Sequence, residues 1–363
     1  MKIPVPQSFV AEASPYKKSV PLSQIARQAG IELAEVACLA SNENPNNPSP
    51  LAIKAIANMQ VYNRYPDGTE LIEAIAKYHA VMPENVILGN GSNDVLDLIA
   101  RTYLGTGSHA VASQYGFAIY QLLTQLTGAK NIVVPANNFG HDLTAMARAI
   151  TQQTKVIWIA NPNNPTGTFV PWHKVKYFLN NVPSSVIVVL DQAYYEYLDE
   201  ANTMPTTDWL TEHPNLVITR TFSKAYGLAS LRIGYGLAGT QIIDLLNRVR
   251  QPFNVNSVAI AAALAALKDQ EFVAQTAAQN MADKADLEAD LSSLGVNFVP
   301  SFGNFVLAEF ADANATNEGL QQAGVLVRPV KEYGLPNHLR ITVGTPLQNK
   351  KLIGTLKKFL ENN

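Results

Sequence analysis

A lysine and an arginine in one short segment are the residues whose types and spacing point most directly to chemistry. The segment TFSKAYGLASLR (221–232) places Lys224 directly after Ser223 and puts Arg232 eight residues further along. A lysine that is partly desolvated and close to another cation can attack a carbonyl carbon and form an imine. The hydroxyl groups of Thr221 and Ser223 could hold a phosphate together with the guanidinium group. A solvated surface loop is the alternative, because most lysines are surface residues.

Three other segments place polar residues where they could join this chemistry. Asp191 ends the apolar run SVIVVLDQ (185–192), and a carboxylate there could accept a hydrogen bond from a protonated ring nitrogen or simply cap the strand. GNGSND (89–94) is a glycine turn before a helix, whose N–H groups and dipole either bind a phosphate or only form a capped turn. The two Asn-Pro steps of NPNNPTG (161–167) predict a rigid turn that presents polar side chains at a fixed place.

These groups together match the needs of one cofactor. A phosphate at a helix N-terminus, a carboxylate facing a pyridinium nitrogen and a lysine that forms an imine are what pyridoxal phosphate requires of a protein. The combination is far more specific than any of its members. We therefore predict a pyridoxal 5'-phosphate site.

The elements that must position these residues have the rhythm of an open α/β sheet. Short β-branched runs alternate with helical stretches over about residues 50–250, and runs such as VIVVL lack the polar alternation of a half-exposed strand. This rhythm predicts a mostly parallel sheet, with the ligand at the carboxyl ends of its strands. Strands are expected at 84–92, 109–114, 131–136, 155–162, 185–192, 215–221 and 231–238, and helices at 93–104, 117–129 and 240–250.

The chain is long enough for a second domain. Its 363 residues exceed the roughly 250–300 residues at which single cores stop growing. After residue 250 the pattern changes to two helices (256–268 and 271–294), four short strands and a final helix. We predict a large cofactor-binding α/β domain at 47–250, and a small α+β domain formed by 1–46 with 251–363.

Composition narrows the class of function. The net charge of −2 gives no basic excess for nucleic acid, and no charge run or long apolar run points to a membrane. The N-terminus has no signal-peptide core, and the one cysteine cannot form an internal disulfide. The six histidines are scattered without the spacing of a zinc site. A cytoplasmic enzyme that acts on small molecules, without a bound metal, is the expectation.

With these motifs in view, the sequence resembles the fold-type I, class I/II aminotransferases, and among them the histidinol-phosphate aminotransferases. The resemblance covers nearly the whole chain in family order, and the lysine–arginine spacing of eight also matches. One motif departs from the family, which commonly has GSDE where this chain has GSND. The matching segments are SNENP (41–45), RYPDG (64–68), GNGSND, NPNNPTG, LDQAYYEY (190–197), TFSKAYGLASLRIGYG (221–236), RQPFNVN (250–256), GNFVL (303–307), VLVRPV (325–330) and LRITVGT (339–345).

The resemblance implies a role for each residue near the cofactor. Lys224 would form the Schiff base and transfer the proton, and Asp191 would pair with the pyridinium nitrogen. Tyr194 and Asn164 would hydrogen-bond the O3′ atom of the cofactor, and the peptide bond before Pro165 would be cis. The residues implied to bind the cofactor phosphate are Ser92, Asn93, Thr221, Ser223 and Arg232.

Two aromatic residues complete the implied cofactor site. Tyr115 would stack on the cofactor ring, with Phe117 as a competitor for that role. Tyr65 would reach the cofactor phosphate of the neighbouring subunit. The resemblance therefore implies a homodimer with shared active sites.

The resemblance also implies the substrates. Arg340 and Arg328 would bind their anionic groups, because a guanidinium group can pair with a carboxylate or phosphate through two hydrogen bonds. Salt bridges within edge strands are the alternative for these two residues. Tyr16 would contribute to the substrate phosphate site, and Asn44, with Asn42 and Glu43, would line its mouth. The implied reaction converts L-histidinol phosphate and 2-oxoglutarate into imidazole-acetol phosphate and L-glutamate, in histidine biosynthesis.

Three other functions remain open from the sequence. An aromatic amino-acid (Phe/Tyr) aminotransferase is the nearest, since a hydrophobic pocket discriminates by only ~1–3 kcal/mol per small change. A pyridoxal-phosphate-dependent threonine-phosphate decarboxylase would use the same fold and the same lysine. A regulatory module that binds the cofactor without catalysis would need a DNA-binding domain, for which the sequence leaves no room before residue 41.

Overall fold

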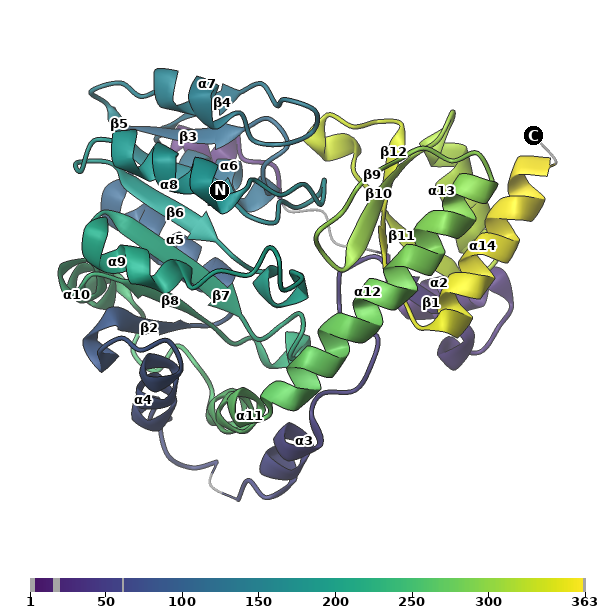
Figure 1. Ribbon diagram of the computed structural model, residues 1–363, viewed down its shortest axis with the longest axis horizontal. Coiled ribbons are helices and arrows are strands. Elements are labelled where there is room, and N and C mark those ends of the chain that lie inside the picture. The colour runs from purple at the N-terminus through teal and green to yellow at the C-terminus, as the bar shows by residue number, and fades with distance from the viewer. Residues whose placement is uncertain (1–3, 16–19, 61, 362–363) are drawn as a thin grey trace.

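The computed structural model describes residues 4–15, 20–60 and 62–361. Its large sheet has seven strands in the order β2-β8-β7-β6-β5-β3-β4, and its small sheet lies to one side of it (Figure 1). All neighbouring strands of the large sheet are parallel except β8, which is antiparallel to β2 and β7. The predicted mostly parallel α/β fold is confirmed. The strand bounds are β2 Val86–Gly89, β3 His109–Ser113, β4 Lys130–Val134, β5 Thr154–Ala160, β6 Ile187–Asp191, β7 Leu216–Thr221 and β8 Gly234–Ala238.

The central strands of this sheet are buried on both faces, as their unbroken apolar runs predict. Ile157 and Val188 belong to one buried apolar cluster, and their neighbours Trp158 and Val189 belong to another. Successive side chains of a strand point to opposite faces, so each cluster covers one face of the sheet. Helices supply the rest of both clusters. Because both faces of the sheet are covered, a ligand can reach it only at the ends of the strands.

Helices flank the large sheet on both sides (Figure 1). Several begin at side chains that satisfy free N–H groups: Ser49 accepts from Leu51 N at the start of α3, and Asn256 accepts from Ala259 N at the start of α11. The helix bounds are α1 Ser8–Ala11, α3 Pro50–Ala57, α4 Thr69–Tyr78, α5 Ser92–Tyr103, α6 Ala118–Leu126, α7 Leu143–Arg148, α8 Trp172–Asn181, α9 Trp209–Glu212, α10 Thr240–Val249 and α11 Ser257–Lys268.

The small sheet has five strands in the order β1-β11-β12-β10-β9. The N-terminal strand β1 pairs in parallel with β11, and the other neighbouring pairs are antiparallel. Strand β1 and helix α2 thus pack with the C-terminal part of the chain, whereas α1 packs against α6 of the large domain; the predicted grouping of 1–46 with 251–363 stays a prediction. The bounds are β1 Ala37–Leu39, β9 Phe298–Val299, β10 Phe305–Glu309, β11 Val325–Pro329, β12 His338–Thr342, α2 Leu22–Ala29, α12 Gln270–Ser293, α13 Ala313–Gln322 and α14 Pro346–Glu361.

The long helix α12 connects the two cores (Figure 1). Val273, near its start, belongs to a large-sheet cluster that also contains Ala259 and Ala263 of α11. Leu287 and Leu291, near its end, belong to the core of the small sheet. The predicted boundary at residue 250 stays a prediction, and this packing favours a later one. We propose that the boundary lies within α12.

A search of the described residues for a helix that could span a membrane found none.

Short 3₁₀ helices occur in several of the connections. The bounds of the 3₁₀ helices are η1 Leu33–Glu35, η2 Pro83–Asn85, η3 Tyr195–Tyr197, η4 Thr206–Asp208, η5 Ala229–Leu231 and η6 Lys331–Tyr333.

Candidate active site

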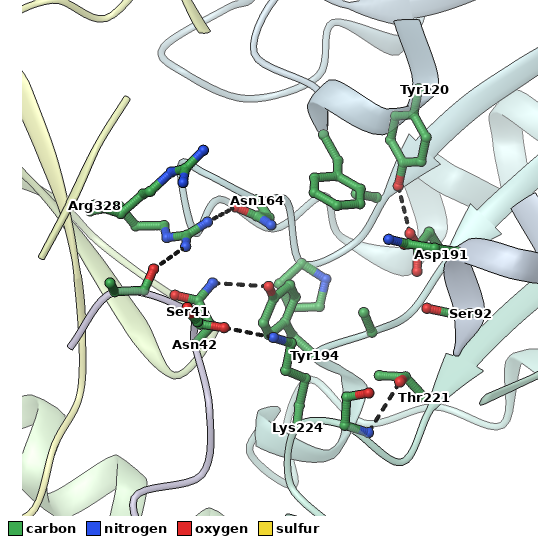
Figure 2. A pocket seen from close by; sticks show the side chains of 18 of the residues that line it. Ser41, Asn42, Ser92, Tyr120, Asn164, Asp191, Tyr194, Thr221, Lys224 and Arg328 are labelled. Atoms are coloured by element: carbon green, nitrogen blue, oxygen red, sulfur yellow. Dashed lines mark hydrogen bonds between the residues drawn. The ribbon is translucent and has the colours of Figure 1, made fainter. Parts of the chain in front are cut away.

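One cavity lies where the carboxyl ends of β5, β6 and β7 face the small domain, the position expected for a ligand in an open α/β sheet. Figure 2 shows Asp191 and Arg328 on opposite sides of it, with Tyr194 and Lys224 between them. The predicted residues that line this cavity include Asn42, Ser92, Asn93, Asn164, Asp191, Tyr194, Thr221, Ser223, Lys224, Arg232, Arg328 and Arg340.

Lys224 presents an amine that loses its proton easily. Burial lowers its pKa from the ordinary value of 10.5 to about 7, and the charges of Arg340 and Arg232 act in the same direction. Its Nζ donates a hydrogen bond to the carbonyl oxygen of Ser41, at 2.9 Å. A large fraction of the amine is therefore neutral near pH 7, which is the form that attacks a carbonyl carbon.

A cradle for an anion forms where α5 begins. Gly91 precedes this helix with a φ of +82°, and a Cβ atom there would overlap the guanidinium group of Arg232. The guanidinium group donates to Ser223 Oγ at 3.3 Å, and the N–H of Ser223 donates to Thr221 Oγ1 at 3.1 Å. The helix N-terminus, two hydroxyl groups and one cation thus meet in one place. This set suits a phosphate dianion.

Asp191 carries an acceptor atom that the protein does not use. Its Oδ2 accepts from the hydroxyl of Tyr120 at 2.7 Å, whereas its buried Oδ1 has no hydrogen-bond partner in the described part of the chain. Burial raises the pKa of this carboxyl, and the Tyr120 hydroxyl, the Thr219 side chain and the Ala193 backbone oppose that rise, with Tyr120 first among them. A buried acceptor without a partner costs about 1–3 kcal/mol. A ligand with an N–H group would satisfy it.

The sequence prediction did not include Tyr120. Its position held one usable signal, because it lies three residues after Phe117 at the start of α6, and residues at this spacing share a face of a helix. Both side chains line the cavity. Only the fold shows that the hydroxyl of Tyr120 reaches Asp191, 71 residues away along the chain.

Tyr194 is held by a residue from the opposite domain. Its hydroxyl accepts from Asn42 Nδ2 at 2.9 Å, and Asn42 is in turn bound to Thr342 Oγ1 through both its N–H and its side-chain oxygen. Lys224 Nζ lies 5.9 Å from the centroid of the Tyr194 ring. The phenol and the amine therefore reach the same part of the cavity.

Two arginines form the small-domain wall. Arg328 on β11 and Arg340 on β12 are directly opposite each other across the strand pair, and both are buried. Arg340 donates to Asn164 Oδ1 and to the Ala40 carbonyl oxygen, each at 2.6 Å, whereas Arg328 donates to Glu332 at 2.6 Å. Like charges in this position repel each other. Among the described residues Arg340 has no carboxylate partner, so the wall favours an anionic ligand.

Two of the predicted residues do not line the cavity, and their predicted contacts stay predictions. Tyr115 is not among the lining residues: its ring stacks on Phe139 with the centroids 5.9 Å apart, and Phe117 is the neighbouring ring that lines the cavity. Asn44 is also outside the lining, because its amide group donates to the Ala225 carbonyl oxygen at 3.0 Å. Of the three residues predicted at the mouth, Asn42 is the one that lines the cavity.

The remaining predictions have separate outcomes. Tyr65 is 79% exposed and lies outside this cavity, with its ring stacked on Phe253 at 4.4 Å between centroids. Tyr16 lies outside the described residues. The peptide bond before Pro165 is cis, as the resemblance implies, and so is the one before Pro162.

Comparisons with known proteins agree with this geometry. The profile of the family "Aminotransferase class I and II" matches residues 34–356. A protein named histidinol-phosphate aminotransferase 1, from Dechloromonas aromatica, is 49% identical over 354 residues, which cover 97% of this chain and 98% of that protein. Histidinol-phosphate aminotransferase 2 from Pseudomonas aeruginosa is 48% identical over 361 residues and 98% of each chain.

Solved structures extend the likeness to three dimensions. The histidinol-phosphate aminotransferase of Sinorhizobium meliloti, solved in complex with pyridoxal-5'-phosphate, is 26% identical, with a TM-score of 0.89 over 98% of this chain and 97% of that one. Aspartate aminotransferase from Thermus thermophilus is 22% identical, with a TM-score of 0.84 over 98% of this chain and 100% of that one, and shows the same fold. The chain belongs to the class I and II aminotransferases.

Proposed function

We propose that this protein is a pyridoxal-phosphate-dependent aminotransferase that converts L-histidinol phosphate and 2-oxoglutarate into imidazole-acetol phosphate and L-glutamate. Full-length relatives that are nearly half identical and carry this activity in their names support the choice of substrates. The observation that carries the chemistry is the placement of the Lys224 amine in one cavity with the anion cradle and with Asp191 Oδ1, which has no hydrogen-bond partner among the described residues.

The side of the cavity formed by the large domain, which we call the large-domain wall, carries Asp191, Lys224 and the anion cradle, and these groups fit the cofactor. Asp191 Oδ1 would accept from its ring nitrogen, and the cradle at the start of α5 would hold its phosphate. Tyr194 and Asn164 would bind O3′, and Phe117, which lines the cavity, competes with Tyr115 for the stacking role. When bound, pyridoxal phosphate supplies an electron sink for the substrate carbanion.

Lys224 would move the proton. Its pKa of about 7 lets Nζ exist in both protonation states near neutral pH, so the same atom can accept a proton from the substrate Cα and return it elsewhere. Arg340 and Arg232 help keep this pKa low. A lysine with its ordinary pKa would stay protonated and could not begin the transfer.

Two arginines would let one wall serve two different substrates. Histidinol phosphate has a phosphate dianion and no carboxylate, whereas 2-oxoglutarate has two carboxylates. Arg328 and Arg340 are both buried at the cavity, and a guanidinium group can bind either kind of anion through two hydrogen bonds. We assign substrate recognition to this pair, with Tyr16 as a further candidate outside the described residues.

A homodimer is part of the proposal. The exposed ring of Tyr65 lies outside the cavity of its own chain, which suits a contact with the cofactor phosphate of a second subunit. Phe253, on which this ring stacks, is also exposed. Each complete site would then contain residues of both subunits.

The test is a transamination assay on the purified protein with added pyridoxal phosphate. The measurement compares kcat/KM for histidinol phosphate and for phenylalanine, each with 2-oxoglutarate. We expect a preference of at least about 100-fold for histidinol phosphate, or roughly 2.7 kcal/mol of transition-state discrimination. Comparable or reversed values would move the function to aromatic amino acids. Cofactor uptake without amino transfer would favour the threonine-phosphate decarboxylase.

A further inference from the structure

Tyr120 is a buried side chain of the cavity to which the proposed mechanism gives no role. Its ring is 1% exposed, and its hydroxyl donates to Asp191 Oδ2 (Figure 2). We propose that Tyr120 is a positioning residue, whose hydroxyl turns Asp191 so that Oδ1 faces the cofactor's ring nitrogen and thereby favours ligands with a protonated ring nitrogen. This inference rests on the proposed function, because it concerns the same cofactor site.

The backbone of Asp191 leaves only its side chain to be oriented. The carbonyl oxygen of Asp191 accepts a hydrogen bond from Asn161 N at 2.9 Å. Asp191 lies on β6, where it pairs with Ala160 of β5 on one side and with Thr219 of β7 on the other. The rotation of the carboxylate is then the remaining freedom. A donor on Oδ2 selects the rotation that turns the other oxygen, Oδ1, toward a ligand.

Tyr120 is itself held in place by packing. Its ring stacks on Trp158 with centroids 5.3 Å apart and parallel planes, and the ring of Phe117 meets it edge-on at 5.7 Å. The indole N–H of Trp158 donates to Thr124 Oγ1 at 3.3 Å, which ties this ring to α6 as well. The hydroxyl therefore has one fixed position, as a positioning donor needs.

The hydrogen bond also acts on the charge of Asp191. Burial alone favours a neutral carboxylic acid, and the donor on Oδ2 is the first of three groups, with Thr219 and the Ala193 backbone, that favour the carboxylate instead. Burial and the nearby Asp191 raise the pKa of Tyr120 well above its usual value, so its hydroxyl stays protonated and keeps donating. The hydrogen bond thereby favours the negatively charged form of Asp191, which a protonated ring nitrogen prefers.

The experiment compares two cofactor probes on the full-length protein freed of cofactor. One is pyridoxal phosphate, and the other is its analogue with a C–H group in place of the ring nitrogen. In the Tyr120→Phe variant we expect pyridoxal phosphate to bind about tenfold more weakly or worse, since a hydrogen bond to a charged group is lost. The analogue should bind within about twofold of its wild-type affinity, because it has no ring nitrogen for Asp191 to recognise.

A matched control separates this role from general packing. Tyr235 is another buried tyrosine, whose hydroxyl bonds to His79 outside the cavity at 2.8 Å. Tyr235→Phe removes a similar hydroxyl and should leave the affinities for both probes unchanged. In an Asp191→Asn background, Tyr120→Phe should change the affinity for pyridoxal phosphate by less than about twofold, because the carboxylate it orients is gone.

The outcomes are distinct. If Tyr120→Phe weakens the binding of both probes equally, the tyrosine only packs the cavity. If it weakens the binding of neither probe, the tyrosine does not orient Asp191. Each result overturns the inference. A full effect of Tyr120→Phe in the Asp191→Asn background overturns it too. A wild-type protein that binds neither probe would instead overturn the proposed function, and the inference with it.

Discussion

The large-domain and small-domain walls of the cavity differ in the charge that they present to a ligand. On the large-domain wall, Asp191 is buried with a hydroxyl donor on one oxygen, and Lys224 has lost most of its affinity for a proton. On the small-domain wall, Arg328 and Arg340 face each other across two strands as like charges. Glu332 balances one of them. Near neutral pH the first wall carries little excess charge, while the second is positive.

This difference matches the residence time that each ligand needs. A wall whose groups are already oriented and whose charges are small suits a cofactor that stays bound through many turnovers. A wall with a permanent excess of positive charge suits two anionic substrates that replace each other. Substitutions on the large-domain wall should therefore reduce turnover with every substrate. Substitutions on the small-domain wall should weaken the binding of substrates and leave cofactor binding unchanged.

The largest effect is expected at Lys224. Lys224→Ala removes both the nucleophile and the proton carrier, so kcat should fall by at least about 10³-fold with every amino donor. Lys224→Arg should not restore activity, since arginine stays protonated. Steady-state kinetics at saturating cofactor measures the loss.

Lys284→Met is the matched control for this change. Lys284 is also a lysine whose pKa is lowered by burial, but it lies on α12 and bonds to the Ser301 carbonyl oxygen outside the cavity. Its replacement should leave kcat per folded molecule within a few-fold. Normal transamination by Lys224→Ala would contradict the mechanism.

The next effect is expected at Asp191, on the same wall. Asp191→Asn keeps the shape but removes the charge that faces the cofactor, and removal of one oriented electrostatic group typically costs about 10²–10³ in kcat. The loss should be similar for both substrates and should leave their KM values nearly unchanged. Asp283→Asn, at a buried aspartate of α12 that bonds to Gln279, provides the control. A loss confined to one substrate would count against the proposed division between the walls.

A smaller and more selective effect is expected on the small-domain wall. Arg340→Lys removes a planar group that can bind a carboxylate through two hydrogen bonds, and about 1.5–3 kcal/mol should be lost for 2-oxoglutarate. Its kcat/KM should fall roughly 10- to 100-fold, while the affinity for pyridoxal phosphate stays within about twofold. Arg248→Lys, at an exposed arginine of α10, controls for the substitution itself. An equal loss of cofactor affinity would show that the two walls are not separable.

The two walls also differ in how well their residues and contacts can be predicted from the sequence. Lys224, Asp191 and the phosphate residues lie at or near the ends of strands that their apolar runs predict. Strand order alone therefore gathers them at one edge of the sheet. The partners on the small-domain wall depend on long-range contacts: the bonds from Arg340 to Ala40 and from Asn42 to Thr342 each span 300 residues. No local pattern predicts such pairs.

The same limit applies to neighbouring candidates within one motif. In SNENP, Asn42 and Asn44 are equivalent as letters, and only the fold turns one toward Tyr194 and the other toward a backbone carbonyl. Tyr115 and Phe117 are two residues apart just before α6, and the start of that helix decides which ring lines the cavity. Local propensity predicts the elements, whereas contacts between elements decide the roles.

The smallest expected effect is on stability, and it tests the low pKa of Lys224 without any catalysis. The folded-state pKa of about 7 lies below the ordinary value of 10.5, so between these pH values the unfolded chain binds a proton that the folded chain does not. The stability contributed by this group therefore rises with pH through that window. Below about pH 7 both states are protonated, and the cost of burying the charge is then largest.

Lys224→Met should consequently raise the Tm of the cofactor-free protein more at pH 6.5 than at pH 9.5. A difference of about 2 °C or more between the two shifts corresponds to roughly 1 kcal/mol for a chain of this size. Lys357→Met, on an exposed part of α14, corrects for the general effect of replacing a lysine. Equal shifts at both pH values would mean that Lys224 keeps its ordinary proton affinity in the fold. The large-domain wall would then be as positively charged as the small-domain wall, and the contrast between them would fail.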